Sequence, residues 1–284
     1  MTSLNLRERL HFPSIIGKSK KDLDVIITEI DNHYRERFEP KIDKQTGNPK
    51  TYKDGTIKQR AIRPSKPLLK AIQRQIKDRI LNQIELPENV HGGVKKRSNI
   101  TNAKPHQGKK YILTTDLQDF YPSIKSKKVY ETFLELGFNK QFSFYITRLT
   151  TWKGELPQGT PTSTHISNIV FLNTDFQLIE LCKIHNITYT RFIDDLTFSS
   201  QQDFQAIIGE ILKIVQDSGL KISRRKTFYN GSQTVTGIEV YLNKIDAPKK
   251  ILDKVQDESL QDEKSLKPYT NYRNNIIKTN KKKK

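Results

Sequence analysis

Two adjacent aspartates, Asp194 and Asp195, interrupt an alternating apolar stretch in the sequence RFIDDLTFSS (191–200). Alternation of this kind predicts two β-strands, one on each side of the aspartates. Neighbouring carboxylates repel one another, so the chain tolerates them either in a solvated hairpin turn or where a positive charge belongs. The pair therefore constrains both the local fold, a tight hairpin, and the chemistry expected at its tip.

A third carboxylate, Asp116, follows the predicted strand YILTT (111–115). If this strand lies beside the hairpin, three carboxylates meet at one sheet edge and repel strongly unless a cation neutralises them. Hard oxygen ligands select Mg²⁺ or Mn²⁺. Two such ions can activate a 3′-hydroxyl and stabilise the leaving pyrophosphate of an in-line phosphoryl transfer. The sequence thus predicts a site for two Mg²⁺ ions, with Mn²⁺ as the alternative.

The chain of 284 residues is strongly basic, with 50 lysines and arginines against 31 aspartates and glutamates and a formal net charge of +19. Such an excess attracts a polyanion, of which nucleic acid is the commonest, with an anionic membrane as the competing partner. We find no apolar run long enough for a membrane span and no signal-peptide core, so we expect a cytoplasmic protein without a membrane partner. The single cysteine, Cys182, excludes a disulfide within the chain and is expected to be buried on a helix.

Hydrophobic periodicity and turn residues predict the order of the other elements. Helices are expected at about 20–37, 68–84, 126–137, 139–150, 162–184 and 203–217. Strands are expected at ITYTRFI (187–193), LTFSS (196–200), GLKIS (219–223) and QTVTGIEVYL (233–242), with a hairpin around Asp54-Gly55 and a basic loop at 91–110. This order fits an α+β sandwich with helices on one face of a sheet.

Four ordered stretches carry a family resemblance: TTDLQDFYPSI (114–124), LPQGTPTSTHISNIV (156–170), RFIDDLTFS (191–199) and GLKISRRKT (219–227). Together they resemble motifs A, B, C and D of reverse transcriptases, over about residues 50–242. Two shorter stretches, NAKPH (102–106) and VTG (235–237), resemble the N-A-x-x-H and V-T-G signatures of retron reverse transcriptases. The combination resembles a bacterial retron reverse transcriptase.

The resemblance implies an α+β, right-hand polymerase with fingers, an RRM-like antiparallel palm and a short helical thumb. The expected divisions are N-terminal helices and fingers in residues 1–110, a palm in residues 111–242, and a short thumb with a basic tail in residues 243–284. Within the last segment, only PKKILDKVQDESLQ (248–261) has a strong helical pattern.

The same resemblance assigns the catalytic and metal-binding roles. Asp116, Asp194 and Asp195 resemble the catalytic, metal-binding triad, and Leu117 is expected to contribute to the metal site. Lys226 occupies the lysine position of motif D, where it is a candidate acid for the departing pyrophosphate or simply a charge facing RNA.

Contacts with the incoming nucleotide are expected from Arg60, Tyr121, Gln158, Gly159 and Lys226. The ring of Tyr121 would exclude a ribose 2′-hydroxyl, or else it packs in the core. Gln158 and Gly159 resemble the floor of the nucleotide site. Arg60 matches the arginine of the fingers that grips the triphosphate, since a guanidinium fork suits phosphate oxygens. Two neighbouring rivals for that role are Lys58 and Arg63.

Primer or RNA contacts are expected from Phe192, Asn102, His106, Lys95, Lys96 and Arg97. Phe192 and Ile193 stand where the family usually has Tyr and Ala, so the ring that can pack under a primer end is kept and its hydroxyl is lost. Asn102 and His106 are expected either to hold RNA or to pack the fingers against the palm, without a chemical role.

The function implied is RNA-directed DNA synthesis from dNTPs on a structured non-coding RNA, primed from a 2′-hydroxyl of that RNA, with msDNA as the product. The family also implies a separate effector protein and a role in anti-phage defence. Two alternatives remain: another bacterial defence or abortive-infection reverse transcriptase, and a non-catalytic RNA-binding protein on a palm-like sheet.

Overall fold

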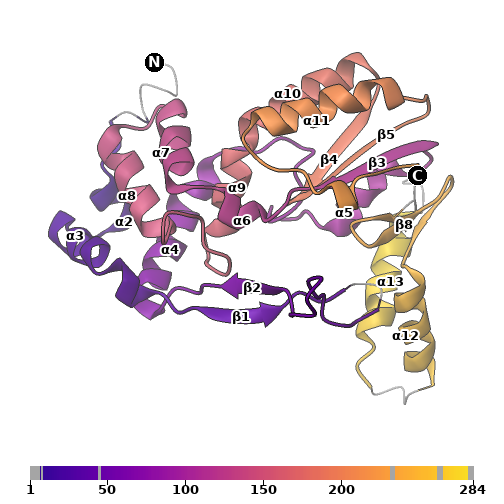
Figure 1. Cartoon of the computed structure of the whole chain (residues 1–284), viewed down its shortest axis with the longest axis horizontal. Coiled ribbons are helices and arrows are strands. Elements are labelled where there is room, and N and C mark those ends of the chain that lie inside the picture. The colour runs from indigo at the N-terminus through magenta and orange to yellow at the C-terminus, as the bar shows by residue number, and fades with distance from the viewer. Residues whose placement is uncertain (1–6, 8, 44–45, 231–233, 261–264, 281–284) are drawn as a thin grey trace. The chain divides into compact units, whose positions relative to one another are not determined.

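The computed structural model describes residues 7, 9–43, 46–230, 234–260 and 265–280 (Figure 1). The chain divides into two compact units, each built from two separate segments. Unit 1 comprises Met1–Glu85 and Asp119–Val170, and unit 2 comprises Leu86–Gln118 and Phe171–Lys284. Both units are therefore discontinuous in sequence. The expected division into fingers, palm and thumb at residues 110 and 242 stays a prediction.

Unit 1 is mainly helical. Its elements are α2 (Phe12–Ile16), α3 (Lys20–Thr28), η1 (Ile30–His33), β1 (Arg37–Pro40), β2 (Gln59–Ile62), α4 (Pro67–Arg79), η2 (Leu81–Gln83), α6 (Phe120–Ser123), α7 (Ser126–Glu135), α8 (Lys140–Thr150) and α9 (Ser163–Val170). Aromatic rings form much of its core: Phe12 stacks on Tyr145 and meets Phe142 edge-on. Helix α4 buries Leu69, Ile72 and Ile76 along one face, as its periodicity predicts.

The hairpin of unit 1 follows the predicted turn chemistry. Strands β1 and β2 pair antiparallel, and beyond them Thr51 bridges Ile57 around the turn that contains Gly55. Gly55 has a φ of 83°, a conformation that glycine adopts without a steric penalty. The prediction of a hairpin at Asp54-Gly55 is confirmed.

Unit 2 is built around a four-stranded antiparallel sheet. Its elements are α5 (Asn99–Ala103), η3 (Lys104–His106), β3 (Tyr111–Asp116), α10 (Leu172–Ile184), β4 (Thr188–Phe192), β5 (Asp195–Ser200), η4 (Gln205–Ile207), α11 (Ile208–Asp217), η5 (Arg224–Lys226), β6 (Phe228–Tyr229), β7 (Thr234–Val235), β8 (Ile238–Val240), β9 (Ile245–Asp246), α12 (Lys249–Ser259) and α13 (Pro268–Lys278). The main sheet has the order β4-β5-β3-β6. Together with α10 and α11 the strands give a β-α-β-β-α-β succession, so the prediction of an RRM-like antiparallel palm is confirmed.

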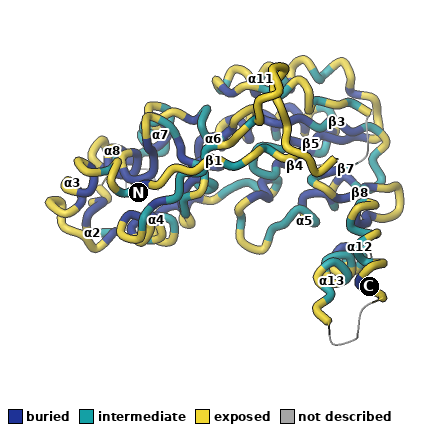
Figure 2. Tube along the Cα trace, turned by 60° about the horizontal axis from the view of Figure 1, so that its bottom comes forward, coloured by how far each residue is buried: buried dark blue, intermediate teal, exposed yellow. Residues whose placement is uncertain are grey.

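The two faces of this sheet have different partners. Helices α10 and α11 cover one face (Figure 1), where Tyr189 of β4 contacts Asp175 of α10. Successive strand residues point to opposite faces, so Asp116, Asp195 and Ser199 share the face away from these helices. Figure 2 shows β3 and β5 as largely buried strands. The carboxylates therefore stand at the end of an otherwise well-packed scaffold.

A second apolar core lies within unit 2. The small sheet β7-β8-β9 packs with α5 and with helix α13 around Ala103, Val235, Ile238 and Ile276. Helices α12 and α13 lie side by side (Figure 1). The sequence predicted only the first of them, because α13 carries a single fully buried residue, Ile276, and its apolar stripe is weak.

Several local predictions need correction. The helix expected over 162–184 is in fact two helices, α9 and α10, separated at Phe171. The sequence did not predict this break, because the apolar pattern continues through it. The GLKIS stretch forms no named strand and pairs only through the bridge between Leu117 and Ile222. The single strand expected over 233–242 is a hairpin of β7 and β8, because Thr236 and Gly237 both adopt positive φ and turn the chain; position 233 itself lies outside the described residues. Part of the loop expected at 91–110 is the helix pair α5 and η3.

Other features match the sequence. Cys182 is buried on α10, and burial raises the pKa of its thiol to about 12. Among the described residues, no helix combines the length and the apolar character needed to cross a lipid bilayer.

Candidate active site

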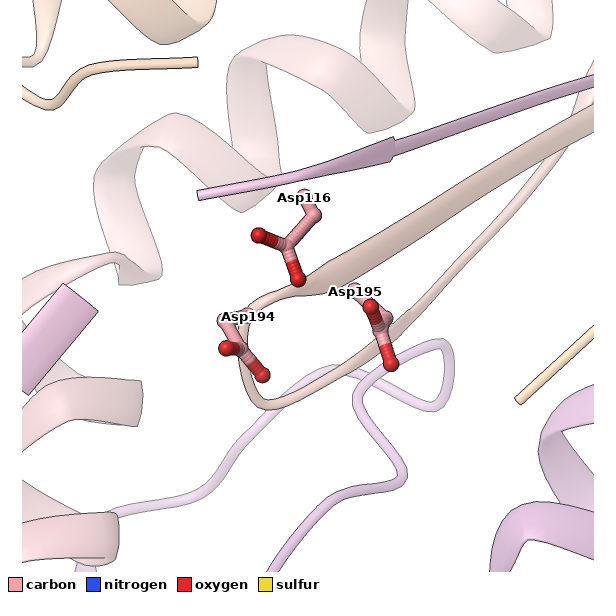
Figure 3. A group of neighbouring side chains, drawn as sticks. All are labelled: Asp116, Asp194 and Asp195. Atoms are coloured by element: carbon pink, nitrogen blue, oxygen red, sulfur yellow. The ribbon is translucent and has the colours of Figure 1, made fainter. Parts of the chain in front are cut away.

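The three predicted carboxylates lie together in unit 2 (Figure 3). Asp116 ends β3, Asp195 begins β5, and the register pairs these two residues directly across the antiparallel ladder. Asp194 occupies the turn before β5. One carboxylate oxygen from each residue lies within 4.8 Å of the others. The prediction that these acids meet at one sheet edge is confirmed.

Backbone hydrogen bonds fix the cluster. The Leu117 amide donates to the Asp194 carbonyl at 2.9 Å, and the Ser223 amide donates to the Asp116 carbonyl at 2.8 Å. These bonds tie the end of β3 both to the hairpin of β4 and β5 and to the segment after α11. The side chain of Leu117 is a buried hydrocarbon without a ligand atom, so any contribution of this residue to the metal site would come from its backbone carbonyl, and that contribution stays a prediction.

Lys226 places a positive charge beside the acid cluster. Its Nζ lies 2.6 Å from Asp116 Oδ2. The lysine side chain is about half exposed, whereas Asp116 is nearly buried. The ion pair offsets part of the repulsion among the carboxylates, because it places a positive charge against one of them.

The donor set fits a hard divalent cation. Mg²⁺ and Mn²⁺ prefer oxygen ligands, and carboxylates are the side chains that supply them. The three acids have oxygens within 4.8 Å of one another. They lie on the face of the sheet that helices α10 and α11 do not cover. The arrangement is suited to metal-assisted phosphoryl transfer.

The turn that carries Asp194 is unusually constrained. Phe192 pairs with Asp195, so Ile193 and Asp194 form a two-residue turn. Ile193 has a φ of 60°, which is a genuine outlier for a β-branched residue. Gly92 approaches so closely that a Cβ there would lie 2.4 Å from the Ile193 nitrogen. No larger residue fits at position 92 without moving this turn.

The candidate triphosphate ligands lie in unit 1, where their surroundings differ. Arg63 Nε donates to Glu36 at 2.6 Å and Nη1 donates to Glu155. Its guanidinium also lies over the Trp152 ring. Arg60, on β2, is exposed. Its rival Arg63 is therefore committed to internal ion pairs, which favours Arg60 for the phosphate role.

The other residues expected at the nucleotide site are also in unit 1. Tyr121, in α6, places its hydroxyl 3.0 Å from Thr164 Oγ1. The Gln158 carbonyl accepts from the Arg63 amide at 2.7 Å. Gly159 has a φ of 106°, and a Cβ there would lie 3.1 Å from the Ile62 side chain. Their nucleotide contacts stay predictions.

The two short signatures meet in unit 2. Asn102 Nδ2 donates to Thr236 Oγ1 at 2.8 Å, which joins NAKPH to the turn of VTG. His106 lies 2.6 Å from Ser199 Oγ through Nδ1 and 2.7 Å from Thr190 Oγ1 through Nε2. The histidine therefore connects η3 to both β4 and β5.

Both signature residues are buried. The side chains of Asn102 and His106 are 0% exposed, and the contact with RNA expected of them stays a prediction. Packing, the second of the two roles expected for them, agrees with their contacts. Burial also lowers the pKa of His106 to about 3, with smaller contributions from His91 and Lys109, so its ring is neutral and one nitrogen accepts while the other donates.

The remaining candidates for RNA contact differ in their environment. Lys95 and Lys96 are exposed. Arg97 Nη1 instead donates to the carbonyls of Pro87 at 2.6 Å and Val90 at 2.5 Å, so it stabilises its own loop. Phe192 is half-buried at the end of β4. None of these positions is tested as an RNA contact.

Sequence reasoning missed a buried ion pair beside the site. Arg191 Nη2 lies 2.6 Å from Asp175 Oδ2, and both side chains are 0% exposed. The signal was present, because Asp175 interrupts the apolar stripe of its helix and Arg191 occupies a core-facing strand position. Charged residues are almost never fully buried unless paired.

The fold and site define a class of protein: a polymerase with an RRM-like palm and a cluster of three carboxylates that fits a divalent cation. Residues 47–240 match the family model described as Reverse transcriptase (RNA-dependent DNA polymerase). The chain belongs to the reverse transcriptase family. This match and the mixed helical and antiparallel architecture confirm the predicted α+β polymerase class.

Curated relatives extend the comparison. Retron Ec86 reverse transcriptase from Escherichia coli is 32% identical over 182 residues, which cover 62% of this chain and 57% of that protein. Retron Se72 reverse transcriptase from Salmonella heidelberg (strain 579083-10) is 30% identical over 239 residues, which cover 80% and 60%. Retron Mx65 reverse transcriptase from Myxococcus xanthus is 31% identical over 204 residues, which cover 64% and 48%. The chain thus spans less than two thirds of these relatives, and the predicted resemblance to retron reverse transcriptases is confirmed.

The buried histidine predicts a pH dependence of stability. His106 stays neutral in the folded protein down to about pH 3, whereas an unfolded histidine takes up a proton near pH 6.5. The unfolded state then binds more protons, so the free energy of unfolding falls as pH drops from 6.5 towards 3, by about 1.4 kcal/mol per pH unit. We expect His106→Gln to flatten this slope in denaturant titrations at a series of pH values.

The control for this prediction is His11→Gln, at an exposed histidine, which should leave the slope unchanged. An unchanged slope in the His106 variant would show that the ring is not held neutral by its surroundings. His91, whose pKa burial and Arg97 lower to about 4, contributes in the same direction and keeps part of the slope in the variant.

Proposed function

We propose that this chain is an RNA-directed DNA polymerase of the retron type, which copies part of a structured non-coding RNA into single-stranded DNA. The observation that carries the proposal is the cluster of Asp116, Asp194 and Asp195 inside the segment that matches the reverse transcriptase family. The retron assignment rests on the curated relatives and on the NAKPH and VTG stretches.

The carboxylates of these three aspartates would hold two Mg²⁺ ions. When bound, Mg²⁺ activates the primer 3′-hydroxyl and neutralises charge on the leaving pyrophosphate. The protein's part is to fix the acids: β3 and β5 hold Asp116 opposite Asp195, and the Leu117 amide anchors the Asp194 carbonyl. This preorganisation lowers the reorganisation needed during the reaction.

Lys226 would serve the same chemistry from the segment after α11. Its ammonium group donates a hydrogen bond to Asp116 Oδ2. Its side chain is about half exposed, so it can rotate towards a phosphate. In the proposed reaction it donates a proton or a hydrogen bond to the departing pyrophosphate. Its pairing with Asp116 limits the repulsion among the acids while no substrate is bound.

Four residues of unit 1 would select the nucleotide. The exposed guanidinium of Arg60 would bind the triphosphate, while Arg63 is committed to Glu36 and Glu155. The ring of Tyr121 would exclude a ribose 2′-hydroxyl by its bulk, independently of the hydrogen bond between its hydroxyl and Thr164. Gln158 and Gly159 would form the floor beneath the base and sugar.

The RNA partner follows from charge and family. A net charge of +19 favours a polyanion, with Lys95 and Lys96 as exposed candidates beside the NAKPH helix. The family implies priming from an RNA 2′-hydroxyl, an msDNA product, an effector protein and a part in anti-phage defence. The alternatives are a defence reverse transcriptase with another RNA, and a non-catalytic RNA-binding protein. The non-catalytic alternative is disfavoured, because three mutually repelling acids would have no role in binding RNA.

The first test removes the metal ligands. The double variant Asp194→Asn with Asp195→Asn should lower DNA synthesis by at least about 1000-fold, because several kcal/mol of transition-state stabilisation depend on the bound ions. RNA affinity should stay within a few-fold, since the carboxylates hold cations and not the template. Primer extension and filter binding on one preparation measure both quantities.

The matched control removes two acidic charges from the same unit. Glu210→Gln with Asp217→Asn alters exposed positions on α11 and should synthesise DNA at the wild-type rate. Undiminished synthesis by the Asp194 and Asp195 variant would remove these acids from the mechanism.

The second test concerns sugar selection. Tyr121→Val should raise ribonucleotide incorporation relative to deoxyribonucleotide by about ten- to a hundredfold, because the excluding ring is lost. Tyr121→Phe keeps the ring and removes only the hydroxyl bonded to Thr164, so it should retain wild-type selection. Steady-state kinetics with both nucleotides decide the matter. Equal selection in the Val variant and the wild type would place the ring in the core only.

A further inference from the structure

The backbone of the catalytic turn needs an external constraint. Ile193 adopts a φ of 60°, which disfavours a β-branched side chain, and such conformations persist only where the surroundings enforce them. The turn is short, because Phe192 pairs with Asp195 immediately on either side of Ile193 and Asp194. Any rotation of the Ile193 peptide would therefore displace the Asp194 carboxylate.

A buried arginine contacts that peptide. Arg191 lies two residues before Ile193 on β4, and its Nη1 donates to the Ile193 carbonyl at 3.0 Å. Its side chain is fully buried, so water does not compete for this donor. The guanidinium is planar and rigid, so its own orientation fixes the direction of the bond.

Asp175 of α10 sets that orientation. Arg191 Nε donates to Asp175 Oδ1 at 2.9 Å and Nη2 donates to Oδ2 at 2.6 Å. The guanidinium also lies over the Phe171 ring, 4.8 Å from its centroid. A bidentate pair and a stacked ring together hold the fork in one plane.

Tyr189 completes the network. Its hydroxyl donates to Asp175 Oδ1 at 2.7 Å. Burial, with a further contribution from the Asp175 charge, raises the pKa of Tyr189 well above its ordinary value, so the hydroxyl keeps its proton and remains a donor. The fully buried Asp175 carboxylate thus accepts these three hydrogen bonds.

The opposite side of the turn is held by the segment 89–92. The Arg191 amide donates to the Asn89 carbonyl and the His91 amide donates to the Arg191 carbonyl, both at 2.8 Å. The close approach of Gly92 to Ile193 leaves no space for the turn to move in that direction. From the core side, the Arg191 side chain restrains the turn through its hydrogen bond to the Ile193 carbonyl.

We propose that Arg191 and Asp175 are positioning residues for the nucleotidyl transfer, because they lock the Ile193 carbonyl and so aim Asp194 towards the metal site. This inference rests on the proposed function. A buried ion pair adds little net stability, because the cost of desolvation offsets its attraction. The proposed role of the pair is therefore to hold Arg191 Nη1 in a fixed position, from which it donates to the Ile193 carbonyl.

The test replaces the pair with apolar residues of similar volume, Asp175→Leu with Arg191→Met. We expect the full chain to fold with a somewhat lower unfolding midpoint than the wild type, because replacing the ion pair itself is nearly neutral but the buried Tyr189 hydroxyl loses its acceptor. Single-nucleotide incorporation on an RNA template with an annealed DNA primer should show kcat lowered by about 100-fold, while KM for the dNTP changes little. A loss of stability alone would not produce this division between kcat and KM.

A second readout does not depend on activity. The Leu117 amide donates to the Asp194 carbonyl, so its hydrogen exchange reports on the turn. Exchange at Leu117 should be faster in the double variant, while the amides of the preceding strand β3 keep their protection. The control is Leu178→Ala, at a fully buried residue of α10, which destabilises the same helix and should leave the kcat of folded protein unchanged.

A third variant, Arg191→Lys, keeps the buried charge but loses the planar fork. It should also lower kcat, and it decides the matter if the double variant does not fold. Wild-type kcat in either folded variant overturns the proposal, and so does failure of both to fold, since the pair would then serve the fold alone. If the wild type itself incorporates no nucleotide, the proposed function fails, whereas Leu117 exchange still tests the positioning.

Discussion

Repulsion among three carboxylates is the constraint on which the rest of unit 2 depends. Like charges placed directly opposite each other across a sheet are destabilising, yet Asp116 faces Asp195 in register. The cost is met by the surrounding structure: a buried antiparallel sheet carries both strands, and Lys226 pairs with Asp116. The packing that stabilises the sheet thus also gathers the three carboxylates at one sheet edge.

The polar contacts behind the hairpin make that arrangement rigid. On one face His106 joins Thr190 and Ser199 across β4 and β5. On the other face Arg191, held by Asp175, reaches the Ile193 carbonyl. These groups are buried and hydrogen-bonded, and satisfied polar networks specify one geometry where apolar packing alone tolerates several. A site that must aim two carboxylates benefits from such specification.

The sequence predicted the strands around the acids, because alternating apolar residues and a two-residue turn are local signals. It also predicted that Asp116 would join Asp194 and Asp195. It did not reveal that Asn102 bonds to Thr236, because a contact across 134 residues has no local pattern. Helix boundaries failed where apolar residues continued through Phe171. The division into two discontinuous units could not be predicted either, since periodicity carries no information on which segments pack together. The buried pair was missed because charged residues were taken to face solvent.

The central claim is that Asp116, Asp194 and Asp195 form a divalent metal site. The direct measurement is a titration of the purified protein with Mn²⁺, followed by electron paramagnetic resonance, with Mg²⁺ as competitor. The account predicts saturable Mn²⁺ binding that Mg²⁺ displaces, and at least a tenfold weaker affinity in Asp116→Asn, about 1.4 kcal/mol per ligand lost. Equal Mn²⁺ affinity in the wild type and the variant would contradict it.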